Sequence, residues 1–211
     1  MKKILLAGLA CGTMMLGVAG LVSATELIDN GSFENPVVSG WGVYTTIPGW
    51  TTLSGPGIEI QHGVVTPADD GFQLVELDSD DGNGHGNSSM LQEIDTIIGK
   101  SYNLSFAYMD RPSTLAATNG IDVYWNNNLL THISGGIYNA WTTLNYTLAG
   151  FGSNTRLVFL ASGNSDTFGG FLDHVSMTTA PVPEPATMLL MGTGLAGLVA
   201  ANRRRKAKKA E

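Results

Sequence analysis

Short segments in which apolar and polar residues alternate constrain the fold of this chain more than any other feature of its sequence. They occupy residues 102–108, 121–125, 144–148, 156–161 and 170–177, and clusters of Gly, Asn, Asp and Pro separate the segments. Alternation with a period of two is typical of strands that bury one face. No stretch between the two ends of the chain has a helical period, so the pattern predicts an all-β domain, an antiparallel jelly-roll β-sandwich.

The N-terminus has the composition of a secretory signal. Two lysines precede an apolar stretch over residues 4–22, and a small-residue cleavage site ends at Ala24. We therefore predict a signal peptide over residues 1–24, with an uncleaved membrane anchor as the alternative. The only cysteine, Cys11, lies inside this signal, so the exported part has neither disulfides nor thiolate chemistry.

The C-terminal region carries a three-part pattern. A proline–acid–proline block comes first, an uncharged apolar run over residues 186–201 follows, and a basic tail comes last. As a helix the run would span about 24 Å, at ~1.5 Å per residue, against the ~30 Å hydrocarbon core of a bilayer. We predict a single transmembrane helix over residues 186–201, with the basic tail in the cytoplasm. The residues that define the block and the tail are Pro183, Glu184, Pro185, Arg203, Arg204 and Arg205.

In this order, the three parts resemble a PEP-CTERM sorting signal, over residues 180–209. The resemblance implies that a membrane-embedded protease of the exosortase type recognises the signal and cleaves near the Pro-Glu-Pro block. The helix would then be a temporary anchor in the inner membrane of a Gram-negative bacterium that makes extracellular polysaccharide. The exported domain would end at the cell surface or outside the cell. An ordinary C-terminal tail anchor is the alternative.

The middle domain, residues 25–179, has a lopsided charge. It holds three basic residues, Lys100, Arg111 and Arg156, against sixteen acidic ones, which gives a formal charge of −13. Because an acidic surface repels phosphate backbones, we do not expect this domain to bind nucleic acid. The charge could instead suit divalent cations or neutral sugars, or only keep an exported domain soluble.

Motifs along the middle domain resemble those of galactose-binding-like jelly rolls. They lie at residues 27–35 (LIDNGSFEN), 47–50 (IPGW), 99–106 (GKSYNLSF) and 170–177 (GFLDHVSM). The pattern is similar to that of carbohydrate-binding modules and of bacterial choice-of-anchor domains. It implies a β-sandwich of this type, although a fold does not fix a ligand.

Two acids in these motifs are candidate ligands of a structural Ca²⁺. By alternation Asp173 shares a strand face with Phe171, Val175 and Met177, and an acid on an apolar face needs a partner. The resemblance implies a calcium ion where the first and last strands meet. Glu34 and Asp173 are the matching acids, and their oxygens suit this ion. In the alternative, Asp173 accepts hydrogen bonds from backbone amides or a hydroxyl group.

The acidic, glycine-rich segment over residues 78–87 is a second place to look for calcium. Gly82 stands where the EF-hand order needs an oxygen ligand, and no Glu follows at the closing position. We therefore expect a flexible surface loop here rather than a calcium site.

Aromatic side chains are the candidate sugar contacts, because sugar rings stack on aromatic faces. Tyr124 and Trp125 point to opposite faces of one predicted strand, so one of the two faces outward. Trp141 follows a glycine pair and could border a cleft. The predicted ligand-binding residues are therefore Trp125, Tyr124 and Trp141, and the alternative places each ring in the core.

The sequence contains no catalytic motif that we can identify: it has no G-x-S-x-G elbow and no H-E-x-x-H helix. Two of the sixteen carboxylates could serve a glycosidase, but nothing in the sequence pairs them. We predict an exported, exosortase-processed protein, not an enzyme, whose sandwich binds or organises extracellular polysaccharide. The alternatives are a purely structural biofilm or matrix protein and a polysaccharide hydrolase. The predicted partners are the processing protease, the polysaccharide and the inner membrane.

Overall fold

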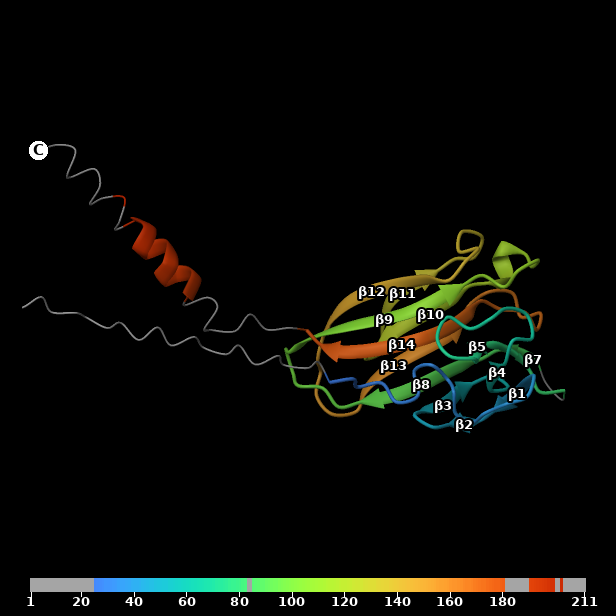
Figure 1. Ribbon diagram of the computed structural model, residues 1–211. Coiled ribbons are helices and arrows are strands. Elements are labelled where there is room, and N and C mark those ends of the chain that lie inside the picture. The colour runs from blue at the N-terminus through green and yellow to red at the C-terminus, as the bar shows by residue number, and fades with distance from the viewer. Residues whose placement is uncertain (1–24, 83–84, 181–189, 200–201, 203–211) are drawn as a thin grey trace, which may run out of the picture.

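Two six-stranded antiparallel sheets pack face to face in this protein (Figure 1). The computed structural model describes residues 25–82, 85–180, 190–199 and 202. The first sheet has the order β1 (Trp41–Tyr44), β4 (Ile58–Gln61), β5 (Leu74–Glu76), β14 (Phe171–Thr179), β9 (Ser101–Met109) and β12 (Thr142–Ala149). The second sheet has the order β11 (Asn128–Ile133), β10 (Ile121–Trp125), β13 (Thr155–Ala161), β8 (Ser89–Ile94), β3 (Trp50–Ser54) and β2 (Thr46–Ile47).

The five strands predicted from alternation are present as β9, β10, β12, β13 and β14, with ends within two residues of the expected ones. In β10, Ile121, Val123 and Trp125 are buried, whereas the two residues between them are partly exposed. The predicted all-β antiparallel sandwich is therefore confirmed. One short 3₁₀ turn, Ala116–Thr118, follows β9.

The main core lies between the two sheets and is built on large aromatic rings. The Trp50 ring lies 5.8 Å from that of Phe33 and 6.0 Å from that of Phe159, centroid to centroid. Phe106 meets Phe159 edge to face at 5.2 Å, and all four side chains are at most 1% exposed. Aromatic pairs of this kind stabilise a core beyond the area that they bury.

A bulge in β14 changes which residues share a face with Asp173. Asp173 pairs with Ala107 of β9 and Ser176 pairs with Ser105, so β14 has one more residue than β9 between these two pairs. His174, inside the bulge, has a φ of 49°. Val175 and Met177 therefore point into the main core, whereas Phe171 belongs to a separate cluster. The prediction that Asp173, Val175 and Met177 share a face was wrong, because a bulge shifts the alternation by one residue.

The outer face of the first sheet carries a smaller cluster of its own. Leu74, Met109 and Phe171 are buried there, and Val65, Ala68 and Trp141 pack against them. The first two of these covering residues belong to the loop between β4 and β5, which lies over the sheet. This cover keeps water from part of a sheet face that alternation alone would leave exposed.

The acidic segment over residues 78–87 contains a small hairpin, β6 (Asp78–Asp80) and β7 (His85–Asn87), in place of the expected loop. Asp78 and Ser79 are fully buried. The Asp78 Oδ2 atom accepts a hydrogen bond of 2.8 Å from the Asp166 amide, and Ser79 Oγ donates one of 2.7 Å to the Gly57 carbonyl. The expectation of a surface loop was wrong for these residues, because they pack beneath neighbouring segments.

Part of the predicted transmembrane segment is helical, over residues 190–199. Its large apolar side chains are exposed. Among the residues that the structure describes, no helix is long and apolar enough to cross a membrane. The remainder of that segment, the signal peptide over residues 1–24 and the six residues that define the sorting signal lie outside the described residues. The signal peptide and the transmembrane span stay predictions.

Candidate functional site

A cluster of buried polar side chains lies on the outer face of the first sheet. Glu59 and Gln61 come from β4, and Glu76 comes from β5, where it stands directly opposite Glu59. The three residues are 7%, 2% and 0% exposed. Buried carboxyl groups need hydrogen bonds or counter-charges, so this arrangement has to be explained by its partners.

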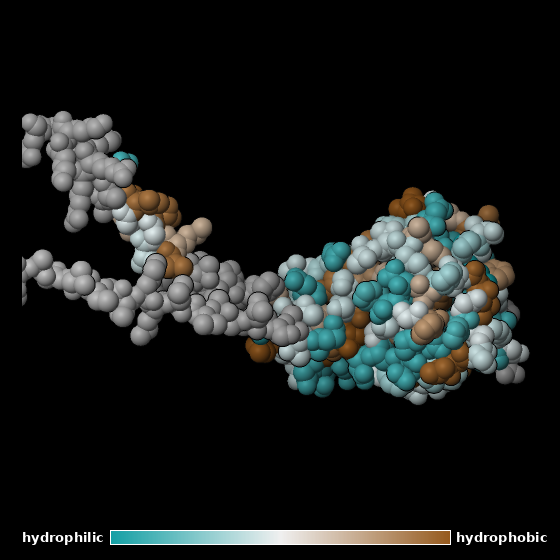
Figure 2. Space-filling view, in the orientation of Figure 1, coloured by the Kyte–Doolittle hydropathy of each residue, from teal (hydrophilic) through white to brown (hydrophobic). Residues whose placement is uncertain are grey.

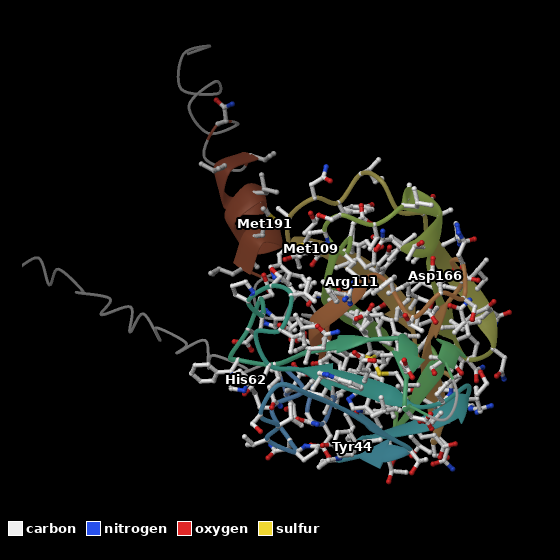
Figure 3. All side chains as sticks on the ribbon, turned by 90° about the vertical axis from the view of Figure 1, so that its right-hand side faces the viewer. Tyr44, His62, Met109, Arg111, Asp166 and Met191 are labelled. Atoms are coloured by element: carbon white, nitrogen blue, oxygen red, sulfur yellow. The ribbon has the colours of Figure 1, made fainter. Side chains whose placement is uncertain are left out.

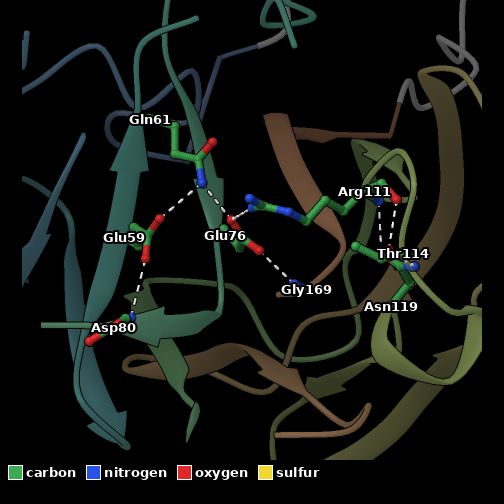
Figure 4. Close-up of polar contacts among 8 residues, drawn as sticks. All are labelled: Glu59, Gln61, Glu76, Asp80, Arg111, Thr114, Asn119 and Gly169. Atoms are coloured by element: carbon green, nitrogen blue, oxygen red, sulfur yellow. Dashed lines mark hydrogen bonds and ion pairs between the residues drawn. The ribbon is translucent and has the colours of Figure 1, made fainter. Parts of the chain in front are cut away.

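One glutamine joins the two acids (Figure 4). Gln61 Nε2 donates hydrogen bonds to Glu59 Oε1 at 2.9 Å and to Glu76 Oε2 at 2.5 Å. Glu59 Oε2 also accepts a bond from the Asp80 amide at 3.3 Å, and Glu76 Oε1 accepts one from the Gly169 amide at 2.5 Å. Each carboxyl oxygen of this pair therefore has a donor.

Arg111 supplies the only described counter-charge within this cluster, through an ion pair between its NH1 group and Glu76 Oε2. Its guanidinium lies over the rings of Phe168 and Phe171, at 4.7 and 5.6 Å from their centroids. Its backbone amide donates to Asn119 Oδ1 at 2.7 Å. These contacts hold a side chain that is only 16% exposed over the buried acid.

Burial controls the protonation of the two acids. It raises the pKa of Glu76 to about 8, against the opposing effects of the Arg111 guanidinium and the Gly169 amide. Burial also raises the pKa of Glu59, which the hydrogen bond from Gln61 opposes. Glu59 also lines a hollow, and a carboxyl group with a raised pKa in such a place marks a candidate functional site.

A hollow of about 160 Å³ opens over this cluster. Trp41, at its rim, is 52% exposed and stands opposite Gln61 in the pairing of β1 with β4. Gln61 Oε1 is buried and has no hydrogen-bond partner, and in Figure 4 it points away from both carboxylates. The hollow is lined by Trp41, Glu59, Gln61, Val64, Asp80, Arg111 and Thr167.

A second hollow, of about 240 Å³, lies on the other side of Arg111. Asp110 fixes its wall, because Asp110 Oδ2 accepts bonds from the amides of Gly136 at 2.8 Å and Tyr138 at 2.9 Å. Figure 3, which faces this end of the sandwich, labels Arg111 near the middle of the view. Arg111 thus borders both hollows and can donate hydrogen bonds into either.

The three aromatic residues predicted to bind a ligand do not form one site. Trp125 is 5% exposed in the main core, and its Nε1 donates to the Ala149 carbonyl at 2.8 Å. Tyr124 is partly exposed on the outer face of the second sheet. Trp141 lies against the loop over the first sheet, with its Nε1 donating to the Pro67 carbonyl at 3.0 Å. Of the pair on β10, the tyrosine is therefore the outward residue.

The two predicted calcium ligands do come together, but around backbone amides. Asp173 Oδ2 accepts bonds from the amides of Asp69 at 2.7 Å and Asp70 at 2.9 Å, and its Oδ1 accepts one from His174 at 2.6 Å. Glu34 Oε1 accepts bonds from two further amides of the same loop, at 2.7 and 2.8 Å.

This donor set does not fit a cation. Amide hydrogens point at both oxygens of Asp173 and at Oε1 of Glu34, and the described residues contain no group of three or more His, Cys, Asp or Glu that could hold a metal. Burial raises the pKa of Asp173 to about 7, and the three amides oppose that rise. Calcium binding by Glu34 and Asp173 stays an untested prediction.

Sequence reasoning missed the acids of the cluster. The run Ile58-Glu59-Ile60-Gln61 alternates, which predicts that Glu59 and Gln61 face solvent, yet all four residues are buried. The one available signal was the scarcity of basic residues, because three against sixteen acids makes each of them, Arg111 included, a candidate partner of a buried acid.

Comparison with known proteins adds one clear result for the C-terminal region. Residues 181–205 match the PEP-CTERM protein-sorting motif. This chain carries a PEP-CTERM sorting signal. The signal marks the protein as exported, and the resemblance noted from the sequence is confirmed over these residues. No curated protein matches the sequence.

The β-sandwich of this PEP-CTERM protein is similar to several solved structures. The K1 cleaved adhesin domain of Lys-gingipain from Porphyromonas gingivalis W83 matches with a TM-score of 0.51 and 15% identity, over 75% of this chain and 99% of that one. A CBM35 from Paenibacillus barcinonensis matches with a TM-score of 0.40 and 17% identity, over 67% of this chain and 100% of that one. A CBM22-1 xylan-binding domain from the same species matches with a TM-score of 0.39 and 11% identity, over 76% of this chain and 98% of that one. These similarities concern the fold alone.

Proposed function

We propose that this exported protein is a noncatalytic module that binds extracellular polysaccharide in the hollow beside Trp41. The observation that carries the proposal is an exposed indole ring at the rim of a hollow lined with fixed polar groups. Sugar sites combine an apolar ring face with a few placed hydrogen-bonding groups, and this hollow offers both.

Each lining group has a part in recognising a sugar. The Trp41 ring would stack on the C–H face of a pyranose. The unpartnered Oε1 of Gln61 would accept a hydrogen bond from a hydroxyl, and Glu59 would accept another. Arg111 would donate to a ring or hydroxyl oxygen. The floor is rigid, because Gln61 is fixed between two carboxyl groups.

A hydrolase is a weaker account of the same residues. Glu59 and Glu76 stand opposite each other on adjacent strands, as the two carboxyl groups of a glycosidase would need. Both oxygens of Glu76, however, are occupied by Gly169, Gln61 and Arg111. Turnover of a polysaccharide that disappears with Glu76→Gln would favour the hydrolase over the binding module.

Titration of the purified protein with polysaccharide from the producing bacterium tests the proposal. We expect Trp41→Ala to lower the affinity about tenfold, the equivalent of about 1.4 kcal/mol, without changing the melting temperature. Phe72→Ala is the matched control, because Phe72 is 69% exposed and does not line the hollow. Tyr124→Ala and Trp141→Ala test the two other aromatic predictions in the same assay.

The outcomes separate the proposal from its structural rival. Equal affinity of Trp41→Ala and Phe72→Ala would contradict the assignment of the hollow. A folded protein that is retained on no glycan would favour a structural matrix or biofilm protein without a sugar site.

We also propose that an exosortase-type protease processes the C-terminal signal and releases the domain from the inner membrane to the cell surface. The match to the sorting motif supports this step. Mass spectrometry of the protein from its native host should give a C-terminus near Pro183–Pro185. A mature protein that keeps Arg205 would contradict the proposal.

A further inference from the structure

Three large apolar side chains at one end of the sandwich are exposed to solvent. Ile97 and Ile98, in the loop from β8 to β9, are 64% and 78% exposed, and Phe151, in the loop from β12 to β13, is 48% exposed. We call these three residues the hydrophobic tip. Contiguous exposed apolar groups on a soluble domain mark a contact with a protein or a membrane.

The tip is a built surface, because hydrogen bonds join its two loops. Thr96 Oγ1 donates to the Gly152 carbonyl at 2.8 Å and accepts a bond from the Phe151 amide at 3.0 Å. The Gly99 amide donates to the Gly150 carbonyl at 3.0 Å. The apolar side chains are therefore presented on a fixed frame instead of on free loops.

The tip lies where the chain leaves the sandwich toward its C-terminal signal. The Ala180 amide donates to the Ser101 carbonyl at 3.0 Å, so the exit is one residue from the loop that carries Ile97 and Ile98. In Figure 1, β14 ends on the left beside the green loop before β9. Figure 2 shows hydrophobic atoms at the same left-hand end.

The length of the connection limits how far this end can be from a membrane. Five residues, 181–185, separate Ala180 from the predicted apolar helix. Even fully extended, that segment spans about 20 Å. While the C-terminal helix anchors the protein, the end of the domain that carries the tip is thus held within about 20 Å of the bilayer.

The charges near the tip also differ from those of the rest of the domain. Lys100 and Arg156, two of the three basic residues between positions 25 and 179, lie in or next to its two loops. With Glu93, Asp95 and Glu26, which pairs with Thr178 just before the exit, they give this end a formal charge of 2 − 3 = −1, whereas the domain as a whole has −13. An approach to anionic lipid is therefore least unfavourable at this end.

From these observations we infer that the hydrophobic tip rests in the interface of the bilayer that anchors the chain. Apolar side chains of this kind insert a few ångströms into the headgroup region. The nine residues of β9 separate the tip from Arg111, about 30 Å at ~3.3 Å per residue. The polar hollow then faces away from the membrane before release. The inference rests on anchoring by the C-terminal helix and is independent of the sugar site.

Depth-dependent fluorescence quenching in nanodiscs tests this orientation. The full-length chain, in a Cys11→Ser background, receives one bimane-labelled cysteine at Ser153 or at Ser134. Both serines are exposed, Ser153 in the β12–β13 loop of the tip and Ser134 at the opposite end after β11. With nitroxide-bearing lipids, we expect the Ser153→Cys label to be quenched several-fold more than the Ser134→Cys label.

Matched isoleucine variants decide the cause of any difference. Ile98→Asp should lower the quenching at position 153 to the level at position 134, and Ile137→Asp, a 70% exposed isoleucine at the far end, should leave it unchanged. Equal quenching of the two labels, no effect of Ile98→Asp, or failure of the chain to enter nanodiscs would each overturn the inference. Equal quenching together with tip-dependent self-association would assign the tip to a second copy of the chain.

Discussion

The two ends of this sandwich break the usual rule of burial in opposite ways. At one end, acids and an arginine are buried under the loop over the first sheet, and Glu76 is wholly inaccessible. At the other end, the Ile97 and Ile98 side chains are exposed to solvent. Buried charge costs stability unless it is paired, whereas an exposed apolar side chain costs the fold almost nothing.

This contrast separates residues that the fold itself requires from residues that a partner outside the domain explains. The polar end must keep its pairing to remain folded, so its residues serve stability and recognition at the same time. The apolar tip contributes little to folding, so a partner outside the domain is the physical reason for its composition. The two ends should therefore respond differently to substitution.

The largest effect is expected from Arg111→Ala. Above pH 8, where Glu76 is ionised, this variant leaves the buried carboxylate without its counter-charge, and breaking a buried pair costs about 3–5 kcal/mol. Arg156→Ala is the control near the tip, where we expect a loss below about 1 kcal/mol. Urea unfolding of both variants measures the difference, and equal losses would break the comparison between the two ends.

A smaller effect is expected from Asp173→Asn. The amide group of asparagine would present hydrogens to backbone donors, which should cost about 1–3 kcal/mol. Asp95→Asn is the control, because exposed Asp95 accepts a single bond, from the Asn154 amide. Melting with and without a chelator belongs to the same experiment. A chelator that lowers the melting temperature of the wild type but not of Asp173→Asn would support calcium binding at Asp173.

The pH dependence of stability sharpens the account of the polar end. Burial raises the pKa of Glu76 to about 8 and that of Asp173 to about 7, both above their values in an unfolded chain. The folded protein then holds these protons more tightly, so unfolding releases them and stability falls as the pH rises from about 4 to 8. We expect the melting temperature to fall by several degrees over this range and Glu76→Gln to flatten the fall. A melting temperature that rises with pH would contradict the assignment.

The smallest effect is expected at the tip. Ile98→Asp should change the free energy of unfolding of the full chain in mild detergent by less than about 0.5 kcal/mol. Leu104→Ala, in the core, should cost about 2–5 kcal/mol in the same assay. A large loss for Ile98→Asp would show that the tip is part of the folded core and would remove the contrast with the polar end.

Alternation predicted the sheets because it reports burial of one face. In β10 every second residue is buried, and the strand ends fall where they were expected. The same logic failed at Glu59 and Gln61, because the loop between β4 and β5 folds back over this face of the sheet and has no period of its own.

The last strand shows a second limit of the sequence. A bulge at His174 exchanges the faces of all residues beyond it, and a non-glycine residue with a φ of 49° leaves no signature in the residue pattern. Motif comparison placed Glu34 and Asp173 near each other, and in the structure both accept bonds from amides of the loop between β4 and β5. It could not show that amide groups occupy three of their four carboxyl oxygens, because backbone donors are not encoded by residue type.

The position of β14 has a mechanical consequence. This strand leads to the C-terminal signal, yet it lies inside its sheet, hydrogen-bonded to β5 on one side and β9 on the other. Tension between the tail and a polymer gripped at the opposite end would run along the strand axis. The bonds of β14 would then be loaded in shear all at once instead of being unzipped one by one, so the domain would resist pulling while it is still tethered.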